Sequence, residues 1–414
     1  MTEPHKAEQP RRDGGLGRDL NARLQGIDPL GWALTLTIAV LAFLYPFYVE
    51  FLQDVPLIGD FIPGVGSMVV MLVFTVMAVG LNIVVGYAGL LDLGYVAFYA
   101  AGAYMAAWLA SQQFEQWHFH LGSVGISKEL SGLHLSIWIV VVLAGVFTTA
   151  VGILIGLPTL RLRGDYLAIV TLGFGEIIPQ FVRNGDNVFG FDLTHGTFGI
   201  SPIDSPGFGK TLSDATNELL PLSYQQSFDR ARWFFWTAVV LLLITVFCSV
   251  RLRDSRLGRA WIAIREDETA AAAMGIPLMR TKTWAYAIGA FFGGVAGAFY
   301  ASFKAGAFPA DFYFNISVFL LCMVILGGLG SVWGVIVGGM VLGYLNVEGL
   351  ATIGTKLQQD AGLNFEPSKY QFGIYGLIIV VMMLFRPTGL ISERRHKREI
   401  EEGVQDESLY GTSK

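Results

Sequence analysis

The residue most able to do chemistry in this chain is an acid inside a long apolar stretch. Glu176, in TLGFGEII, follows Gly173 and Gly175. A carboxylate at membrane depth is costly and is by default a functional candidate. Two roles fit the pattern: Glu176 accepts hydrogen bonds from a substrate ammonium group, or it pairs with a neighbouring helix.

A second acid lies where an apolar stretch begins. Asp92, in GYAGLLDLGYVAF, follows Gly86 and Gly89. Asp is a preferred residue at helix starts because its carboxylate accepts hydrogen bonds from free backbone N–H groups. We therefore expect Asp92 to cap or hinge a helix start rather than to contact substrate.

A charged segment, Arg251–Lys282, interrupts two long apolar stretches. Its first part places Leu257, Trp261 and Ile264 on one helical face, with Arg256 and other charged residues off that face. This pattern predicts an amphipathic helix.

The second part of the segment has the start and stop signals of another, shorter helix. Glu266, Asp267 and Glu268 stand where a helix N-terminus favours negative charge, and four alanines follow at 270–273. Gly275 is suited to end the helix, and Pro277 cannot continue it. The segment thus predicts two helices joined by a turn, a surface on which a soluble partner could dock.

Other chemistries find little support. The six histidines do not pair with Cys or carboxylates at metal-ligand spacing, so we expect exposed loop histidines and no metal or cofactor. Cys248 and Cys322 lie in apolar stretches, and no disulfide is expected. Gly209-Lys210-Thr211 resembles the end of a phosphate-binding loop, but Asp204 stands where that motif needs glycine. The chain is therefore not expected to be an ATPase or another enzyme.

Composition places these residues in a membrane protein. The chain is 53% hydrophobic and only 15% charged, against about 25% charged in soluble domains. An apolar run of about 20 residues spans the hydrocarbon core as a helix. We predict an all-α polytopic protein with about ten transmembrane helices, in a domain over residues 30–390. The ten predicted spans are Leu30–Phe51, Gly66–Val84, Leu93–Ala110, Leu135–Ile155, Asp165–Phe181, Trp233–Val250, Trp284–Phe303, Phe312–Leu329, Val332–Leu350 and Tyr370–Leu390.

The number of spans is decided by two features. Gly327, Gly328, Gly330 and Gly334 favour a tight hairpin between the eighth and ninth spans over one long helix. With ten spans and the N-terminus inside, 20 of the 28 Lys and Arg residues face the cytoplasm, as the positive-inside rule expects. Residues 1–29 and 391–414 are then cytoplasmic tails, the first span is retained rather than cleaved, and Arg251–Lys282 is a cytoplasmic loop.

Fifty glycines, many of them inside the apolar stretches, allow transmembrane helices to approach closely. Two stripes have a spacing of four residues: Gly289, Gly293, Gly297 and Gly330, Gly334, Gly338. Close helix packing and small residues along a substrate path are both compatible with them.

Several motifs together resemble a known family. They are REDETAAAAMGI (265–276), LNIVVGYAGLLDLGYVAFYAAGAY (81–104), LRGDYLAIVTLGFGEII (162–178), DLTHGTFGI (192–200), LGGLGSVWG (326–334) and FRPTGLI (385–391). The motifs span most of the chain and follow the family's order. They resemble the LivM-type membrane subunits of ATP-binding-cassette importers for branched-chain amino acids. The chain departs from the pattern at His195, where the family more often has glycine, and the outer loop at 205–232 is long.

The resemblance implies partners and roles. It implies a sister permease of the LivH type, two ABC ATPase subunits that hydrolyse ATP, and an extracytoplasmic binding protein for leucine, isoleucine or valine, in a bacterial inner membrane without nucleic acid. By family analogy the ATPase-coupling contact lies on Arg265, Glu266, Asp267, Glu268, Ala271 and Gly275. We would place the substrate path along Asp92, Thr171 and Glu176. A urea or short-amide permease of the same wider family and a stand-alone secondary transporter remain alternatives.

Overall fold

A computed structural model describes residues 42–55, 59–122, 131–162, 164–188, 190–206, 226–361 and 366–391. The tails, most of the first predicted span and Gly209-Lys210-Thr211 lie outside these residues. A helix covers residues 42–53. The other α-helices are α3 (Val65–Asn82), α4 (Val96–Leu109), α5 (Ile137–Thr159), α6 (Asp165–Arg183), α8 (Gln226–Asp254), α9 (Arg256–Glu266), α10 (Glu268–Ala273), α11 (Leu278–Lys304), α12 (Phe314–Gly327), α13 (Val332–Tyr344), α14 (Leu350–Ala361) and α15 (Gln371–Phe385).

The helices confirm a polytopic membrane protein. Within the described residues, seven helical stretches are long and apolar enough to cross a membrane, and α4 is a shorter apolar helix. A chain crossing hydrocarbon must satisfy its backbone hydrogen bonds internally, and a helix does so within one segment. The seven stretches are Gly59–Tyr87, Ile137–Thr159, Arg230–Asp254, Leu278–Lys304, Pro309–Gly327, Val332–Gln359 and Pro367–Phe385.

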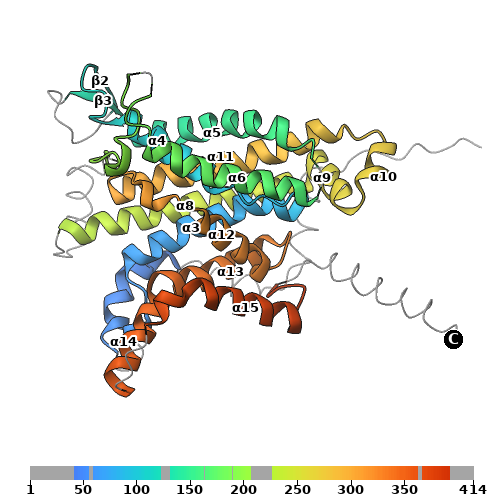
Figure 1. The fold of residues 1–414 in the computed structure, drawn as a ribbon. Helices are drawn as coiled ribbons and strands as arrows, with labels where there is room; N and C mark the ends of the chain where they lie inside the picture. The colour runs from blue at the N-terminus through green and yellow to red at the C-terminus, as the bar shows by residue number, and fades with distance from the viewer. Residues whose placement is uncertain are drawn as a thin grey trace, which may run out of the picture.

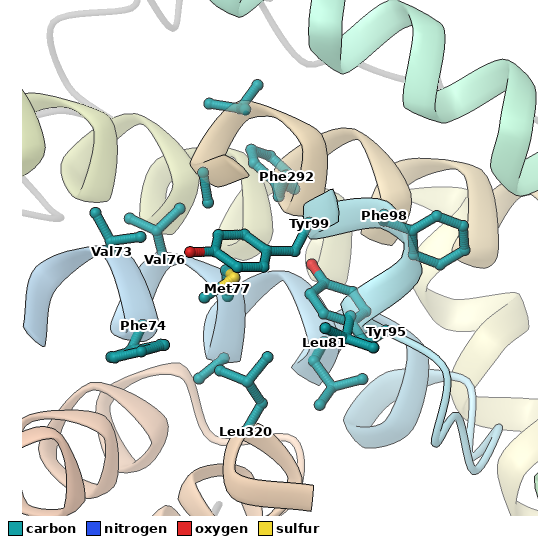
Figure 2. Close-up of a cluster of buried hydrophobic side chains, with 14 of the residues drawn as sticks. Val73, Phe74, Val76, Met77, Leu81, Tyr95, Phe98, Tyr99, Phe292 and Leu320 are labelled. Atoms are coloured by element: carbon teal, nitrogen blue, oxygen red, sulfur yellow. The ribbon is translucent and has the colours of Figure 1, made fainter. Parts of the chain in front are cut away.

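Two helices form the centre of the bundle. α3 contacts α8, α13 and α11, while α11 packs along α4 and α5. Side chains from α3, α4, α11 and α12 meet in one apolar cluster that includes Met77, Tyr99, Phe292 and Leu320 (Figure 2). α15 instead lies at the periphery, with Leu377 and Phe385 exposed, as expected of a helix that faces lipid.

Glycines bring the central helices into backbone contact. A Cβ placed on Gly102 of α4 would lie 2.2 Å from the carbonyl oxygen of Gly294 in α11. A Cβ on Gly297 would lie 2.1 Å from the carbonyl oxygen of Tyr99, and one on Gly338 would lie 2.6 Å from that of Met323. The two glycine stripes are therefore packing surfaces between helices of this chain.

The predicted hairpin between the eighth and ninth spans is confirmed. α12 ends at Gly327, α13 begins at Val332, and the two helices are in contact. Gly328 and Gly330 adopt φ values of 114° and 83°, which favour glycine. The Ser331 hydroxyl then accepts a hydrogen bond from the Gly334 N–H and starts α13.

The bundle has two distinct ends (Figure 1). One end carries α9 and α10, together with the 328–331 turn and the chain after α15. The opposite end carries β2 and β3, and is held together by contacts such as the Ser302 hydroxyl donating to the Asp204 carbonyl oxygen at 2.7 Å. We call these the α10 end and the sheet end.

The all-α prediction needs a correction at the sheet end. β1 (Ala110–Ser111) and β2 (His118–Leu121) both pair with β3 (Gly132–Leu135), antiparallel and parallel respectively. The prediction failed because the helical spans dominate the pattern and these strands are at most four residues long.

One loop histidine was also predicted wrongly. His134 is buried, and its Nδ1 lies 2.8 Å from the Asp204 Oδ2. His120 stacks on it at 4.9 Å between ring centroids. Burial raises the pKa of the Asp204 carboxyl, and its hydrogen bond from His134 opposes that rise.

A substitution at the α4–α11 contact tests the role of glycine packing. Gly102→Ala should lower stability by about 1–3 kcal/mol, since the added methyl overpacks a backbone contact. Thermal unfolding of the purified protein in detergent measures the loss. Gly376→Ala on α15, where no atom lies within 4 Å of the new Cβ, is the control. Equal unfolding temperatures for the two variants would contradict the packing account.

Candidate functional site

The α9–α10 loop forms as its sequence predicts. α9 starts at the Ser255 cap, whose hydroxyl accepts from the Gly258 N–H at 3.2 Å. Trp261 and Ile264 are buried, while Arg256 and Arg259 are exposed. The amphipathic face therefore lies against the bundle and the basic face lies in solvent.

Both ends of α10 have strong caps. The Asp267 carboxylate accepts from the backbone N–H groups of Thr269 at 2.7 Å and Ala270 at 3.0 Å. These two hydrogen bonds hold the pKa of the Asp267 carboxyl below its ordinary value of 3.8, and the bond from Ala270 has the larger effect. Gly275 follows the helix with φ +84°, and the Ile276 N–H donates to the Ala271 carbonyl oxygen at 3.1 Å. The helix is therefore short but well defined.

Three further contacts fasten the loop to the bundle. The Trp261 Nε1–H donates to the carbonyl oxygen of Thr281 at 2.8 Å. The buried Lys282 ammonium lies 2.8 Å from the Glu268 carboxylate. The Arg265 guanidinium donates to the carbonyl oxygen of Gly86, at the end of the α3 helical stretch. Glu268 and Arg265 thus hold the loop in place from its inner side.

A small apolar surface remains exposed on α10. Ala271 faces the bundle and is buried, and Glu266 is exposed beside the helix. Met274 is 84% exposed. We call the exposed residues Thr269, Ala270, Ala272, Ala273, Met274 and Gly275 the α10 surface. An exposed methionine beside small side chains suits contact with another protein, since methionine is enriched at protein interfaces.

The structure brings together two of the three predicted path residues. Asp92 and Thr171 are fully buried. The Thr171 hydroxyl accepts from the Leu93 N–H at 3.1 Å, and one Asp92 carboxylate oxygen accepts from the Gly94 N–H at 2.8 Å. Asp92 therefore braces a turn. The cap on α4 that was predicted for Asp92 comes instead from Ser317, whose hydroxyl accepts from the Val96 N–H at 2.9 Å.

Glu176 lies apart from that pair. It is exposed on the opposite face of α6, beside Ile177, Gln180 and Phe181, where these side chains line a shallow hollow. Tyr166 and Ile169 continue the exposed face toward the start of α6. This polar and apolar mixture distinguishes α6 from α15, whose exposed side is apolar.

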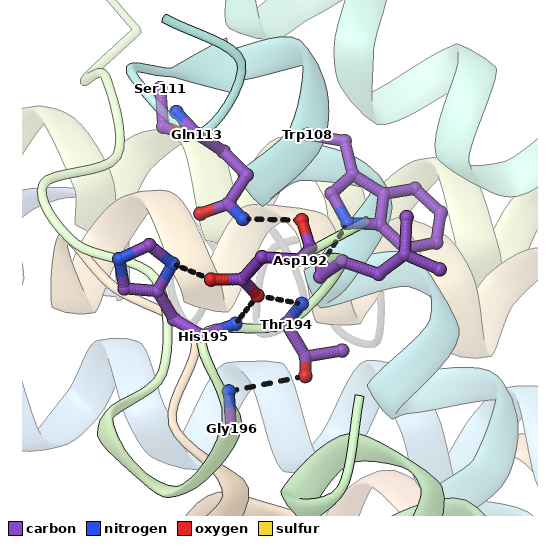
Figure 3. Close-up of polar contacts among 8 residues, drawn as sticks. Trp108, Ser111, Gln113, Asp192, Thr194, His195 and Gly196 are labelled. Atoms are coloured by element: carbon purple, nitrogen blue, oxygen red, sulfur yellow. Dashed lines mark hydrogen bonds and ion pairs between the residues drawn. The ribbon is translucent and has the colours of Figure 1, made fainter. Parts of the chain in front are cut away.

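The sheet end carries the DLTHGTFGI motif. One Asp192 carboxylate oxygen accepts from the backbone N–H groups of Thr194 and His195, and the other lies 2.8 Å from the His195 Nδ1 (Figure 3). Gln113 and Trp108 fasten the motif to the end of α4 by donating to backbone carbonyls. His195 has φ 56°, a conformation that favours glycine.

A hollow of about 610 Å³ opens beside this motif. Its lining is largely polar, and comes from the residues after α4 and from the motif itself. The lining residues are Ser111, Gln112, Gln113, Phe114, Glu115, Gln116, Trp117, Gly190, Phe191, Asp192, His195, Ile200 and Ser201.

Sequence reasoning missed three residues that fix these arrangements. Lys282 was counted only as a basic residue, yet it is buried against Glu268. Ser317 and Tyr286 lie far along the chain from the segment that they contact around Asp92. No spacing pattern joins these positions, because their contacts depend on how separate helices pack.

These features define a polytopic membrane protein with the capped α9–α10 loop at one end and a polar hollow at the other. The family model described as branched-chain amino acid transport system, permease component, matches residues 65–384. The chain belongs to this family.

Individual relatives agree with the family match. The chain is 36% identical over 341 residues to the high-affinity branched-chain amino acid transport system permease protein LivM of Salmonella typhimurium, covering 80% of this chain and 71% of the relative. It is 35% identical over 342 residues to LivM of Escherichia coli, with the same shares. LivH of S. typhimurium is 28% identical over 155 residues, covering 37% of this chain and 44% of the relative. No solved structure matches the chain.

Removing the cap of α10 should loosen the helix. Asp267→Ala should destabilise α10 by about 1 kcal/mol, because two backbone N–H groups lose their acceptor. Asp267→Asn should keep most of the helix, since Asn is also a good cap. Hydrogen–deuterium exchange of residues 268–273 reports the change. Equal exchange in the Ala variant and the unchanged protein would refute the capping role.

Proposed function

We propose that the chain is the LivM-type permease subunit of an ATP-driven, binding-protein-dependent importer of branched-chain amino acids in a bacterial cell membrane. Its family and its LivM relatives support the substrate class. The observation that carries the ATP-driven mechanism is the α10 surface: a capped, apolar helix fastened to the bundle by Arg265 and Glu268 yet open on its outer side.

The proposal includes ten spans, with both termini and the α10 end in the cytoplasm. Connections between successive described helices alternate between the two ends of the bundle, as a series of membrane crossings requires, and the chain after α15 lies at the α10 end. The excess of Lys and Arg at the α10 end supports its cytoplasmic placement.

In this proposal the α10 surface docks on one ABC ATPase subunit. Closure of two ATPases on ATP moves α10, and the caps at Asp267 and Gly275 let the short helix move as a rigid unit. Ala271 keeps the inner side of the helix small enough to pack on the bundle. The permease itself hydrolyses no ATP.

The face of α6 that carries Glu176 meets the sister permease of the LivH type. A carboxylate exposed to lipid costs several kcal/mol by some scales, whereas one facing protein or a water-filled path does not. Between two permeases, Glu176 can accept hydrogen bonds from the ammonium group of an amino acid. Asp92 and Thr171 support this helix from behind rather than touching substrate.

The polar hollow at the sheet end receives the extracytoplasmic binding protein. Glu115, Trp117 and His195 supply charged, aromatic and hydrogen-bonding groups there. A urea or short-amide permease would share this architecture, but its neutral substrate could not form the charge-assisted hydrogen bond that Glu176 offers an ammonium group. A secondary transporter working alone would have no use for the α10 surface.

A charge on the α10 surface should block ATPase docking. Met274→Asp should abolish co-purification of the ATPase subunits, since it buries an unpaired carboxylate in an apolar contact. Phe198→Asp at the sheet end is the matched control, because Phe198 is also 84% exposed.

The control variant should retain the ATPases, and both variants should insert in the membrane normally. Retention of the ATPases by Met274→Asp would exclude α10 as the docking helix. Loss of the ATPases from both variants would show a general assembly defect and would also count against the assignment.

Neutralising Glu176 should slow amino-acid transport. Glu176→Gln should lower labelled leucine uptake about tenfold or more, because an ammonium group loses a charge-assisted hydrogen bond. Glu366→Gln, at an exposed ion pair with Lys369, should leave uptake unchanged. Uptake of urea but not leucine by the unaltered complex would favour the amide permease instead.

A further inference from the structure

Residues 88–95 form a short segment that lies between α6 and the α9–α10 loop, residues 256–275, which we call the docking loop in line with its proposed role. On the side of the docking loop, the Arg265 side chain passes directly over the segment. A Cβ placed on Gly89, which has φ +66°, would lie 2.8 Å from the Arg265 Cγ. Arg265 therefore fits only because residue 89 lacks a side chain and turns in the left-handed region.

Arg265 also caps the C-terminal end of the helix that precedes this segment. The Gly86 carbonyl belongs to the last turn of a π-helix, Ile83–Tyr87, where carbonyl oxygens have no donor within the helix. The Arg265 guanidinium supplies that donor. A cation there is also favoured by the helix dipole. A displacement of Arg265 thus acts on both the end of the π-helix and the start of segment 88–95.

On its other side the segment contacts α6. The Leu93 N–H donates to the Thr171 hydroxyl at 3.1 Å. A Cβ on Gly94 would lie 2.3 Å from the Thr171 carbonyl oxygen, and one on Gly175 would lie 3.2 Å from the Leu93 carbonyl oxygen. Backbone therefore touches backbone over more than one turn of α6, beginning five residues before Glu176.

The segment is stiff between these two contacts. The buried Asp92 carboxylate accepts from the Gly94 N–H, and the Tyr95 hydroxyl donates to the Gly289 carbonyl oxygen of α11 at 2.8 Å. A stiff segment transmits a displacement that a flexible loop would absorb. A π-helix adjoins the segment on its N-terminal side, and such turns often lie at functional sites.

We propose that residues 88–95 are the transmission element that carries movement of the docking loop to α6, with Arg265 as its input and Thr171 as its output. The proposal rests on the proposed function, because it needs an ATPase to move α10 and a path along α6. Arg265 and Thr171 are positioning residues in this scheme, and neither touches substrate. Movement of α9 and α10 shifts segment 88–95, and the segment then tilts the α6 face that carries Glu176.

Transport per ATP hydrolysed tests the coupling in the full complex with its binding protein, reconstituted in proteoliposomes. Thr171→Val and Arg265→Gln should each lower leucine molecules transported per ATP about fivefold, the lower end of typical couplings between sites. Thr171→Ser keeps the hydroxyl and should restore the ratio. Thr159→Val is the matched control, because the buried Thr159 hydroxyl donates only to carbonyls of its own helix in the bonds described.

The double variant Thr171→Val/Arg265→Gln shows whether the two residues act along the same coupling path or along two independent ones. On one path the second substitution adds little, so the double variant should resemble the single ones. A ratio that falls by the product of the two single effects would overturn the proposal, as would an unchanged ratio in Thr171→Val. If Thr171→Val does not assemble, Gly175→Ala replaces it and crowds the Leu93 carbonyl from the α6 side, with the same expectation.

The proposed function is checked in the same preparation. An unaltered complex that fails to bind ATPases or to transport leucine would refute the function and the inference together. An unaltered complex that transports leucine, with a full ratio in the Thr171 and Arg265 variants, would refute the inference alone.

Discussion

The structure depends on helices that approach until backbone touches backbone. At Gly102, Gly297 and Gly338, the space for a Cβ is already occupied by a backbone carbonyl oxygen of the facing helix. In a membrane, apolar side chains gain little by leaving lipid, so close packing of small residues supplies much of the association. α11 approaches α3 and α4 this closely because Gly289, Gly293 and Gly297 face them without side chains.

This packing leaves the functional parts at the margins of a rigid centre. The α9–α10 loop touches the bundle through Trp261, Arg265 and the Glu268–Lys282 pair, while α10 itself presents small apolar side chains to solvent. α6 contacts the centre along one face and exposes Glu176 on the other. A firm core with two less enclosed elements suits the proposed role, in which one partner moves α10 and α6 moves against another.

Much of this arrangement could be predicted from the sequence where the signal is local. Apolar length predicted the helices, glycines at 327–330 predicted the hairpin, and Asp267 and Gly275 predicted both ends of α10. Contacts between distant segments could not be predicted. Asp92 looked like a helix cap, yet Ser317, more than 200 residues later, caps α4. The small sheet and the buried His134 were missed because their partners come from separate loops. Thr171 and Glu176 lie on opposite faces of α6, and Asp92 lies in the turn that contacts Thr171.

The central claim is that the α10 surface faces the cytoplasm and is covered by an ATPase subunit. The most direct test is maleimide labelling of a Met274→Cys variant in a background with Cys248 and Cys322 replaced. A membrane-impermeant maleimide should label inside-out vesicles of the permease pair, leave intact cells unlabelled, and react far less when the ATPases are present. Labelling in intact cells, or equal labelling with and without the ATPases, would contradict the account.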